Sequence, residues 1–145
     1  MARPLPNGFG MPEPSILVLI VDDEPLIRWA LAQTLVGHGC GIVEACDARS
    51  ATALLEDGSR RFDVVMLDYH LPDAHDLTLL ETTRRLSPAS YVIMMSAMMT
   101  PEIATRALQV GASQVLQKPL ELDAVAGLVL NARGAQPLSR AASHD

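Results

Sequence analysis

The segment ILVLIVDDEP, residues 16–25, runs from six consecutive apolar residues directly into three acidic ones. A short aliphatic run without polar interruption is typical of a strand that is buried on both faces of a sheet. Pro25 then suits the first turn of a helix, where a missing N–H costs little. The acids Asp22, Asp23 and Glu24 therefore stand where a buried strand ends, and their mutual repulsion requires a compensating partner.

The same alternation repeats along the chain. Apolar runs at residues 42–46, 63–67, 91–95 and 114–117 are each followed by a segment with helical spacing. Asp47, Asp76 and Thr100 stand where the second, third and fourth helices would need a capping residue. Five such units predict an α/β, flavodoxin-like fold: a doubly wound five-stranded parallel sheet in the order 2-1-3-4-5, with five helices.

The predicted elements define one domain over residues 16–133. Residues 1–15 are rich in Pro and Gly, and we expect a flexible N-terminal leader there. Gly134 is expected just past the last helix, which makes residues 134–145 a polar tail or a truncated linker. Of the two cysteines, we expect Cys40 to be a loop thiol and Cys46 a small core residue.

Composition narrows the classes of function. The 145 residues carry a formal net charge of −6, which disfavours direct binding to nucleic acid through the phosphate backbone. The sequence has no secretory signal and no apolar run near the roughly 18 residues that suggest a membrane span. We therefore expect a cytoplasmic protein that binds neither nucleic acid nor membrane.

Polar residues follow four of the predicted strands. Asp22 and Asp23 follow the first, Asp68 the third, Ser96 the fourth and Lys118 the fifth. The carboxyl ends of parallel strands meet at one edge of a sheet, so these side chains should converge. Oxygen ligands without paired Cys or His favour Mg²⁺, with Mn²⁺ as an alternative. The set suits attack on phosphorus by an Asp68 oxygen, with Mg²⁺, Lys118 and Ser96 stabilising the phosphoryl oxygens.

The segments VLIVDDEPLIRWAL, DVVMLDYHLPD, MMSA and QKP resemble the receiver domain of two-component response regulators, over residues 16–133. The first segment is most similar to nitrogen-regulation-type receivers. The resemblance implies a bacterial phosphorelay protein that takes a phosphoryl group from a histidine kinase or a histidine phosphotransfer protein. It implies a signalling switch, which catalyses only its own phosphorylation and dephosphorylation, rather than a turnover enzyme.

The resemblance also assigns roles to single residues. It implies that Asp68 is the phosphoacceptor, that Ser96 and Lys118 bind phosphoryl oxygens, and that the Lys118–Pro119 peptide is cis. The implied Mg²⁺ ligands are Asp23 directly, Asp22 directly or through water, Asp68, and the backbone carbonyl of His70. Glu24 and Pro25 are expected outside the metal's ligand set, where a partner kinase docks.

Three positions tune or alter this scheme. Val115 stands where receivers usually carry an aromatic residue that reports phosphorylation, and His70 and Met98 occupy positions that influence how long the phosphoryl group lasts. Many relatives dimerise through the surface that includes position 115, so a homodimer is a further implied partner.

Other functions fit the residues less well. One alternative is a pseudo-receiver that acts as a protein-interaction module without phosphorylation, and the residue at 115 keeps it open. A haloacid-dehalogenase-type phosphatase is disfavoured because His70 stands where a second Asp is needed. A transition-metal site at His70 and His75 is disfavoured because the spacing fits no zinc pattern.

Overall fold

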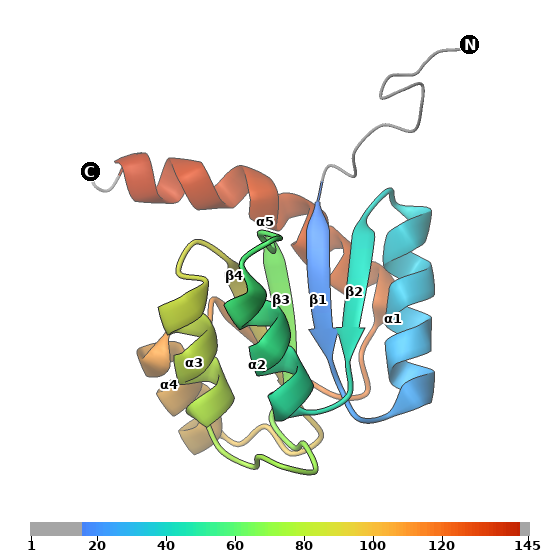
Figure 1. Ribbon diagram of the computed structural model, residues 1–145, viewed down its shortest axis with the longest axis vertical. Coiled ribbons are helices and arrows are strands. Elements are labelled where there is room, and N and C mark those ends of the chain that lie inside the picture. Colours follow the sequence, from blue (N-terminus) through green and yellow to red (C-terminus); the bar gives the residue numbers. More distant parts are fainter. Residues whose placement is uncertain (1–15, 143–145) are drawn as a thin grey trace.

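The sheet of this protein is the predicted one. The computed structural model describes residues 16–142, and the expected leader at residues 1–15 lies outside the described residues. Five strands pair in parallel in the order β2-β1-β3-β4-β5 (Figure 1). The strands are β1 (Leu17–Val21), β2 (Gly41–Ala45), β3 (Val64–Asp68), β4 (Tyr91–Ser96) and β5 (Gln114–Gln117). The helices are α1 (Pro25–Gly37), α2 (Ala48–Asp57), α3 (Thr78–Leu86), α4 (Pro101–Val110) and α5 (Leu122–Ala142).

Two helical layers cover the sheet. Helices α1 and α5 lie on one face, and α2, α3 and α4 lie on the other (Figure 1). Successive residues of β1 point alternately into these layers: Val18 and Ile20 pack with α1 and α5, whereas Leu19 and Val21 pack with the other three helices. Burial on both faces explains why the strand reads as an unbroken apolar run.

The helix ends follow from local side-chain chemistry. The Asp47 carboxylate accepts the Ser50 N–H at the start of α2, and the Thr100 hydroxyl accepts the Ile103 N–H at the start of α4, as predicted. Gly58 ends α2 with φ of 73°, a left-handed conformation that favours glycine. The third predicted cap is displaced by one residue. Asp76 accepts the Thr78 N–H, but Leu77 occupies the N-cap position of α3.

The last helix extends further than the sequence predicts. Gly134 lies inside α5, which continues to Ala142, so the segment expected as a tail begins as helix. A single Gly costs a helix only about 1 kcal/mol, which good helix formers around it can offset. Within residues 16–142, no helix combines the length and apolar character that a membrane span needs.

Cys40 lies in a loop as expected, but the expected burial of the two cysteines is wrong. Cys40 is buried and Cys46 is exposed. Cys40 lies between α1 and β2, where its N–H bonds to the Leu35 carbonyl and its side chain joins the core under α1 and α5. Burial raises the pKa of the Cys40 thiol. Cys46 follows the last residue of an edge strand and therefore leaves the core.

Candidate functional site

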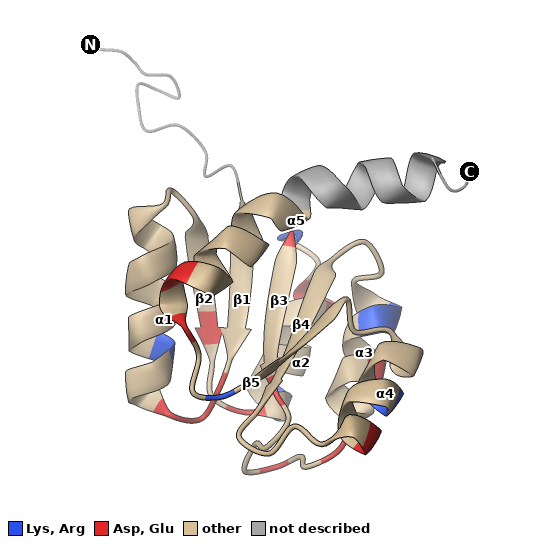
Figure 2. Ribbon diagram, turned by 180° about the vertical axis from the view of Figure 1, so that it is seen from behind, with Lys and Arg blue, Asp and Glu red and all other residues tan. Residues whose placement is uncertain are grey.

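The carboxyl ends of the strands form a rim that collects acidic residues (Figure 2). Asp22 directly follows β1, and Asp68 and Ser96 are the last residues of β3 and β4. Lys118 directly follows β5, and its backbone N–H bonds to the Ser96 carbonyl at 2.8 Å. The strand order therefore brings together residues that lie far apart in the sequence, as predicted.

The Lys118 ammonium group is the centre of this rim. Its Nζ donates to Asp22 Oδ2 at 2.7 Å, to Glu24 Oε1 at 3.0 Å and to Asp68 Oδ2 at 3.1 Å. An ammonium group has three donors, so three carboxylates use all of them. Asp22 is 0% exposed, Asp68 6% and Lys118 8%, whereas the Glu24 side chain is 56% exposed. Glu24 is thus the member of the cluster that faces solvent.

The turn after β1 decides which acids join the cluster. Asp22 Oδ1 accepts the Glu24 N–H at 2.9 Å, a local turn that carries the Glu24 side chain back toward Lys118. The Arg28 guanidinium donates to the Asp22 carbonyl at 2.7 Å and fixes the same turn. Asp23, which lies between Asp22 and Glu24 in the sequence, is exposed. Sequence reasoning placed Asp23 among the Mg²⁺ ligands and Glu24 outside them. In the structure the Glu24 carboxylate contacts Lys118, and the role of Asp23 stays a prediction.

The charges of the cluster shift its pKa values. Burial raises the pKa of Asp68, and the nearby Asp22 charge adds to this, while the His70 N–H and Lys118 oppose it. Burial also disfavours the Lys118 ammonium, but hydrogen bonds to Asp22 and Glu24 and the charges of Asp22 and Asp68 outweigh it. The pKa of Lys118 is therefore raised above its usual value. Lys118 is a fixed positive charge beside the Asp68 carboxylate.

Of the remaining predicted residues, His70 contacts Asp68 directly. The His70 N–H donates to Asp68 Oδ1 at 3.1 Å, which orients the carboxylate, while the His70 side chain is exposed. Ser96 is fully buried and its Oγ accepts the Met98 N–H at 3.0 Å, which leaves the hydroxyl proton to donate elsewhere. The Met98 side chain is 67% exposed.

Val115 packs at the edge of the core on the α2, α3 and α4 face. The Lys118–Pro119 peptide is cis, as the resemblance implied.

The donor atoms suit a hard cation. One carboxylate oxygen each from Asp22, Glu24 and Asp68 lies within 4.8 Å of the others. Oxygen-only sets of this kind match Mg²⁺, which is commonly held by one or two carboxylates together with water and phosphate oxygens. The residues present therefore fit the metal that the sequence predicts.

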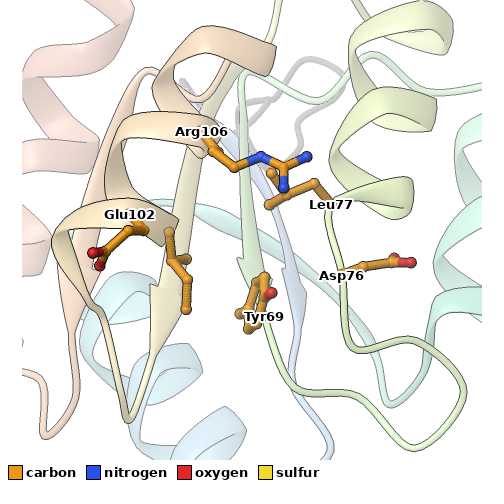
Figure 3. A pocket seen from close by; sticks show the side chains of 6 residues that line it. Tyr69, Asp76, Leu77, Glu102 and Arg106 are labelled. Atoms are coloured by element: carbon orange, nitrogen blue, oxygen red, sulfur yellow. The ribbon is translucent and has the colours of Figure 1, made fainter.

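A separate pocket of about 180 Å³ opens beside the rim, between the segment after β3 and the first turns of α4 (Figure 3). Its lining residues are Tyr69, Asp76, Leu77, Glu102, Ile103 and Arg106. This set contains none of the residues that hold Lys118. The pocket is therefore a neighbour of the carboxylate cluster and not part of it.

Sequence reasoning missed the role of Asp73. Its two carboxylate oxygens accept the N–H groups of Ala48 at 2.8 Å and Arg49 at 3.0 Å. The segment that follows Asp68 is thereby tied to the first turn of α2. A lone exposed Asp gives no sequence signal for a cap that acts on a helix 24 residues away.

The carboxylate cluster, its place at the strand ends and the strand order agree with one known family. The response regulator receiver domain family matches residues 18–129. The chain belongs to this family. The receiver domain has the described topology, so the predicted family and fold are both confirmed.

Similar proteins include regulators of the nitrogen-regulation type. The DNA-binding transcriptional regulator NtrC of Escherichia coli strain K12 is 34% identical over 115 residues, which are 78% of this chain and 24% of that protein. This chain thus spans about a quarter of that relative's length.

Solved structures of response regulators share the fold of this chain. A CheY-like receiver domain protein from Methanospirillum hungatei JF-1 has a TM-score of 0.80 and 26% identity, with 86% of this chain and 98% of that chain covered. NtrX from Brucella abortus, solved in complex with ADP, has a TM-score of 0.77 and 32% identity, with 88% of this chain and 29% of that chain covered.

Proposed function

We propose that this receiver domain accepts a phosphoryl group on Asp68 in a Mg²⁺-dependent reaction and thereby switches a partner or an output domain. The observation that carries the proposal is the buried cluster in which Lys118 contacts Asp68 at 3.1 Å and Asp22 at 2.7 Å. A buried acceptor carboxylate beside a fixed ammonium suits the transfer of a charged phosphoryl group.

The donor is the phosphohistidine of a histidine kinase or a histidine phosphotransfer protein. A lone pair of an Asp68 carboxylate oxygen forms the new O–P bond, and the P–N bond to the donor imidazole breaks. The imidazole leaves with the bonding electrons and takes up a proton. Reset is hydrolysis: a water oxygen bonds to phosphorus, the P–O bond to Asp68 breaks, and inorganic phosphate leaves.

Each residue of the cluster has a task in this reaction. The His70 N–H holds one Asp68 oxygen, and Lys118 offers positive charge to the phosphoryl oxygens. The Ser96 hydroxyl has a proton free to donate to one of those oxygens. Asp22, Asp23, Asp68 and the His70 carbonyl are the ligands proposed for Mg²⁺, and Glu24 adds a further carboxylate. When bound, Mg²⁺ supplies positive charge for the transferring group.

Two exposed side chains are proposed to set the lifetime of the phosphoryl group. The His70 N–H contacts Asp68 and the Met98 N–H contacts Ser96, and both side chains are exposed. We expect His70→Ala with Met98→Ala to change the hydrolysis rate by several-fold, measured by loss of the phosphorylated mass over time. Unchanged hydrolysis in the double variant would remove both residues from this role.

The surface of α1 supports kinase docking near Pro25. Leu26, Trp29 and Val36 are exposed apolar side chains on this helix, and Pro25 is exposed at its start. Leu26 and Trp29 lie within the first two turns, close to the rim where the phosphoryl group must arrive. We propose that the kinase or phosphotransfer protein contacts this end of α1. A homodimer remains a second proposed partner.

The test uses a small phosphodonor. Incubation with acetyl phosphate and Mg²⁺ should add one phosphoryl group by intact mass, and Asp68→Asn should abolish the addition. Asp57→Asn, an exposed Asp at the end of α2 and away from the rim, serves as the matched control and should retain it. A wild-type protein that folds and binds Mg²⁺ but never gains the mass would refute the proposal and favour a pseudo-receiver that acts only as an interaction module.

A further inference from the structure

Glu24 is the one carboxylate partner of Lys118 that is exposed to solvent. Asp22 is fully buried, and Asp68 is the acceptor itself. The Glu24 side chain is 56% exposed, and its bond to Lys118 is 3.0 Å, against 2.7 Å for Asp22 and 3.1 Å for Asp68. An exposed ion pair contributes little because water solvates both separated charges well. The link between Glu24 and Lys118 is therefore the one that breaks at least cost.

The donors of Lys118 are fully used. The three N–H bonds of the ammonium go to three carboxylates, so no donor remains for a phosphoryl oxygen. A phosphoryl group on Asp68 brings several oxygens and further negative charge to the place where Glu24 already contributes a full charge. Phosphorylation moves the charge of Asp68 onto the phosphoryl group, so the Asp68 bond can pass to one phosphoryl oxygen. A second phosphoryl oxygen can bond to the ammonium only if another carboxylate leaves, and repulsion by the added negative charge acts on the exposed Glu24.

We propose that Glu24 is a positioning residue that holds Lys118 before phosphorylation and is displaced from it by the phosphoryl group. The inference rests on the proposed function of the site and gives Glu24 a role toward Lys118 that is separate from metal binding and partner contact. Before phosphorylation, Glu24 shares the ammonium with Asp22 and Asp68 and occupies its third donor. Afterwards the Glu24 carboxylate turns to solvent, and the phosphoryl oxygen takes its bond.

The displacement has a kinetic consequence. While Glu24 stays in place, its charge opposes the approach of an anionic phosphodonor. Removing one charge at this distance in a partly solvated site should speed phosphoryl uptake about three- to tenfold, and added salt should shrink the gain. Asp22 and Asp68 keep Lys118 at the rim in the variant, because their bonds do not depend on Glu24.

The sequence provides a direct probe. Lys118 is the only lysine of the 145 residues, so isotopic labelling of lysine gives one side-chain signal that reports on this cluster. The experiment records that signal in wild type and in Glu24→Gln, each alone and with Mg²⁺ and beryllofluoride, a stand-in for the phosphoryl group. Glu24→Gln keeps the size of the side chain and removes its charge. Glu56→Gln, near the end of α2 and away from the rim, is the matched control.

We expect the Lys118 signal to differ between Glu24→Gln and wild type in the free proteins, and to coincide once beryllofluoride is bound. Glu56→Gln should match wild type in both states. A difference that persists with beryllofluoride would show that Glu24 stays on Lys118, and no difference in the free proteins would show that it does not hold Lys118. Either result overturns the proposal. A Glu24 with a purely structural role would not make the Lys118 signals of wild type and Glu24→Gln differ in the free proteins and coincide with beryllofluoride bound.

Phosphorylation kinetics separate this proposal from the proposed function. In saturating Mg²⁺, Glu24→Gln should take up the phosphoryl group of acetyl phosphate faster than wild type and Glu56→Gln. If wild type takes up the group and Glu24→Gln is equal or slower, the role of Glu24 is wrong while the receiver function stands. If wild type takes up no group, the proposed function itself fails.

Discussion

Asp73 offers a sharp test of how the segment after Asp68 is held. Its carboxylate accepts two backbone N–H groups, those of Ala48 and Arg49, at the first turn of α2. Asp47 accepts the next one, from Ser50, so three consecutive N–H groups that lack helical partners are satisfied by two carboxylates. We predict that Asp73→Ala destabilises the domain by detaching the segment after β3 from this helix.

The magnitude follows from the geometry. Loss of a capping side chain costs about 0.5 to 2 kcal/mol, and the interaction of its charge with the helix dipole contributes about 0.3 to 1 kcal/mol. In the variant, water can bond to the two exposed N–H groups. We therefore expect a loss of unfolding free energy near the middle of the combined range, at about 1 to 2 kcal/mol. For a domain of this size, that loss lowers Tm by roughly 3 to 8 °C.

Urea denaturation followed by circular dichroism measures this loss. Asp73→Asn keeps one carbonyl acceptor and should lose about half as much. Asp57→Ala removes the same charge at the other end of α2, where a carboxylate opposes the helix dipole, and should cost little. Equal stability of Asp73→Ala and wild type would refute the reasoning, as would an equal loss in Asp57→Ala.

Further substitutions test other parts of the fold. Thr100→Ala removes the cap of α4 and should lower the free energy of unfolding by about 1 kcal/mol in the same assay. Gly127→Ala, in α5 with open space around the new methyl group, should stabilise by up to about 1 kcal/mol, whereas Gly58→Ala, at φ of 73°, should destabilise by a similar amount. Leu80→Ala, at a fully buried position of α3, should lower the free energy of unfolding by about 2 to 5 kcal/mol. Ser50 lowers the pKa of Asp47, so the stabilising effect of Asp47 is full above pH 4 or so and is lost as pH falls through its lowered pKa. The gap in stability between wild type and Asp47→Asn should therefore close in acid.

The sheet and the convergence of Asp22, Asp68 and Lys118 could be predicted because they depend on patterns that span the whole chain. Unbroken apolar strands require cover on both faces, and parallel strands bring their carboxyl ends to one edge. Every residue at the end of such a strand then lies at the rim, whatever the details of the loops. The sequence position of these residues, directly at the end of a predicted strand, was enough to place them correctly.

Features that depend on one turn could not be predicted in this way. Glu24 reaches Lys118 because the Asp22 side chain turns the chain back, and the sequence gives no measure of that turn. The capping role of Asp73 depends on how a loop lies across a neighbouring helix. The end of α5 was placed too early because Gly134 is a common stop signal that the surrounding helix overrides.

The bond between Asp22 and Lys118 joins residues that are 96 positions apart. Closing a loop of this length costs more entropy than closing a short one, so we expect this contact to form after the strands between have paired. During synthesis, Asp22 and Asp68 leave the ribosome well before the lysine that neutralises them. The proposed acceptor site is therefore assembled only in a folded domain, and the proposed phosphoryl uptake would report that folding is complete. A histidine kinase that relies on this site would pass its signal to folded copies alone.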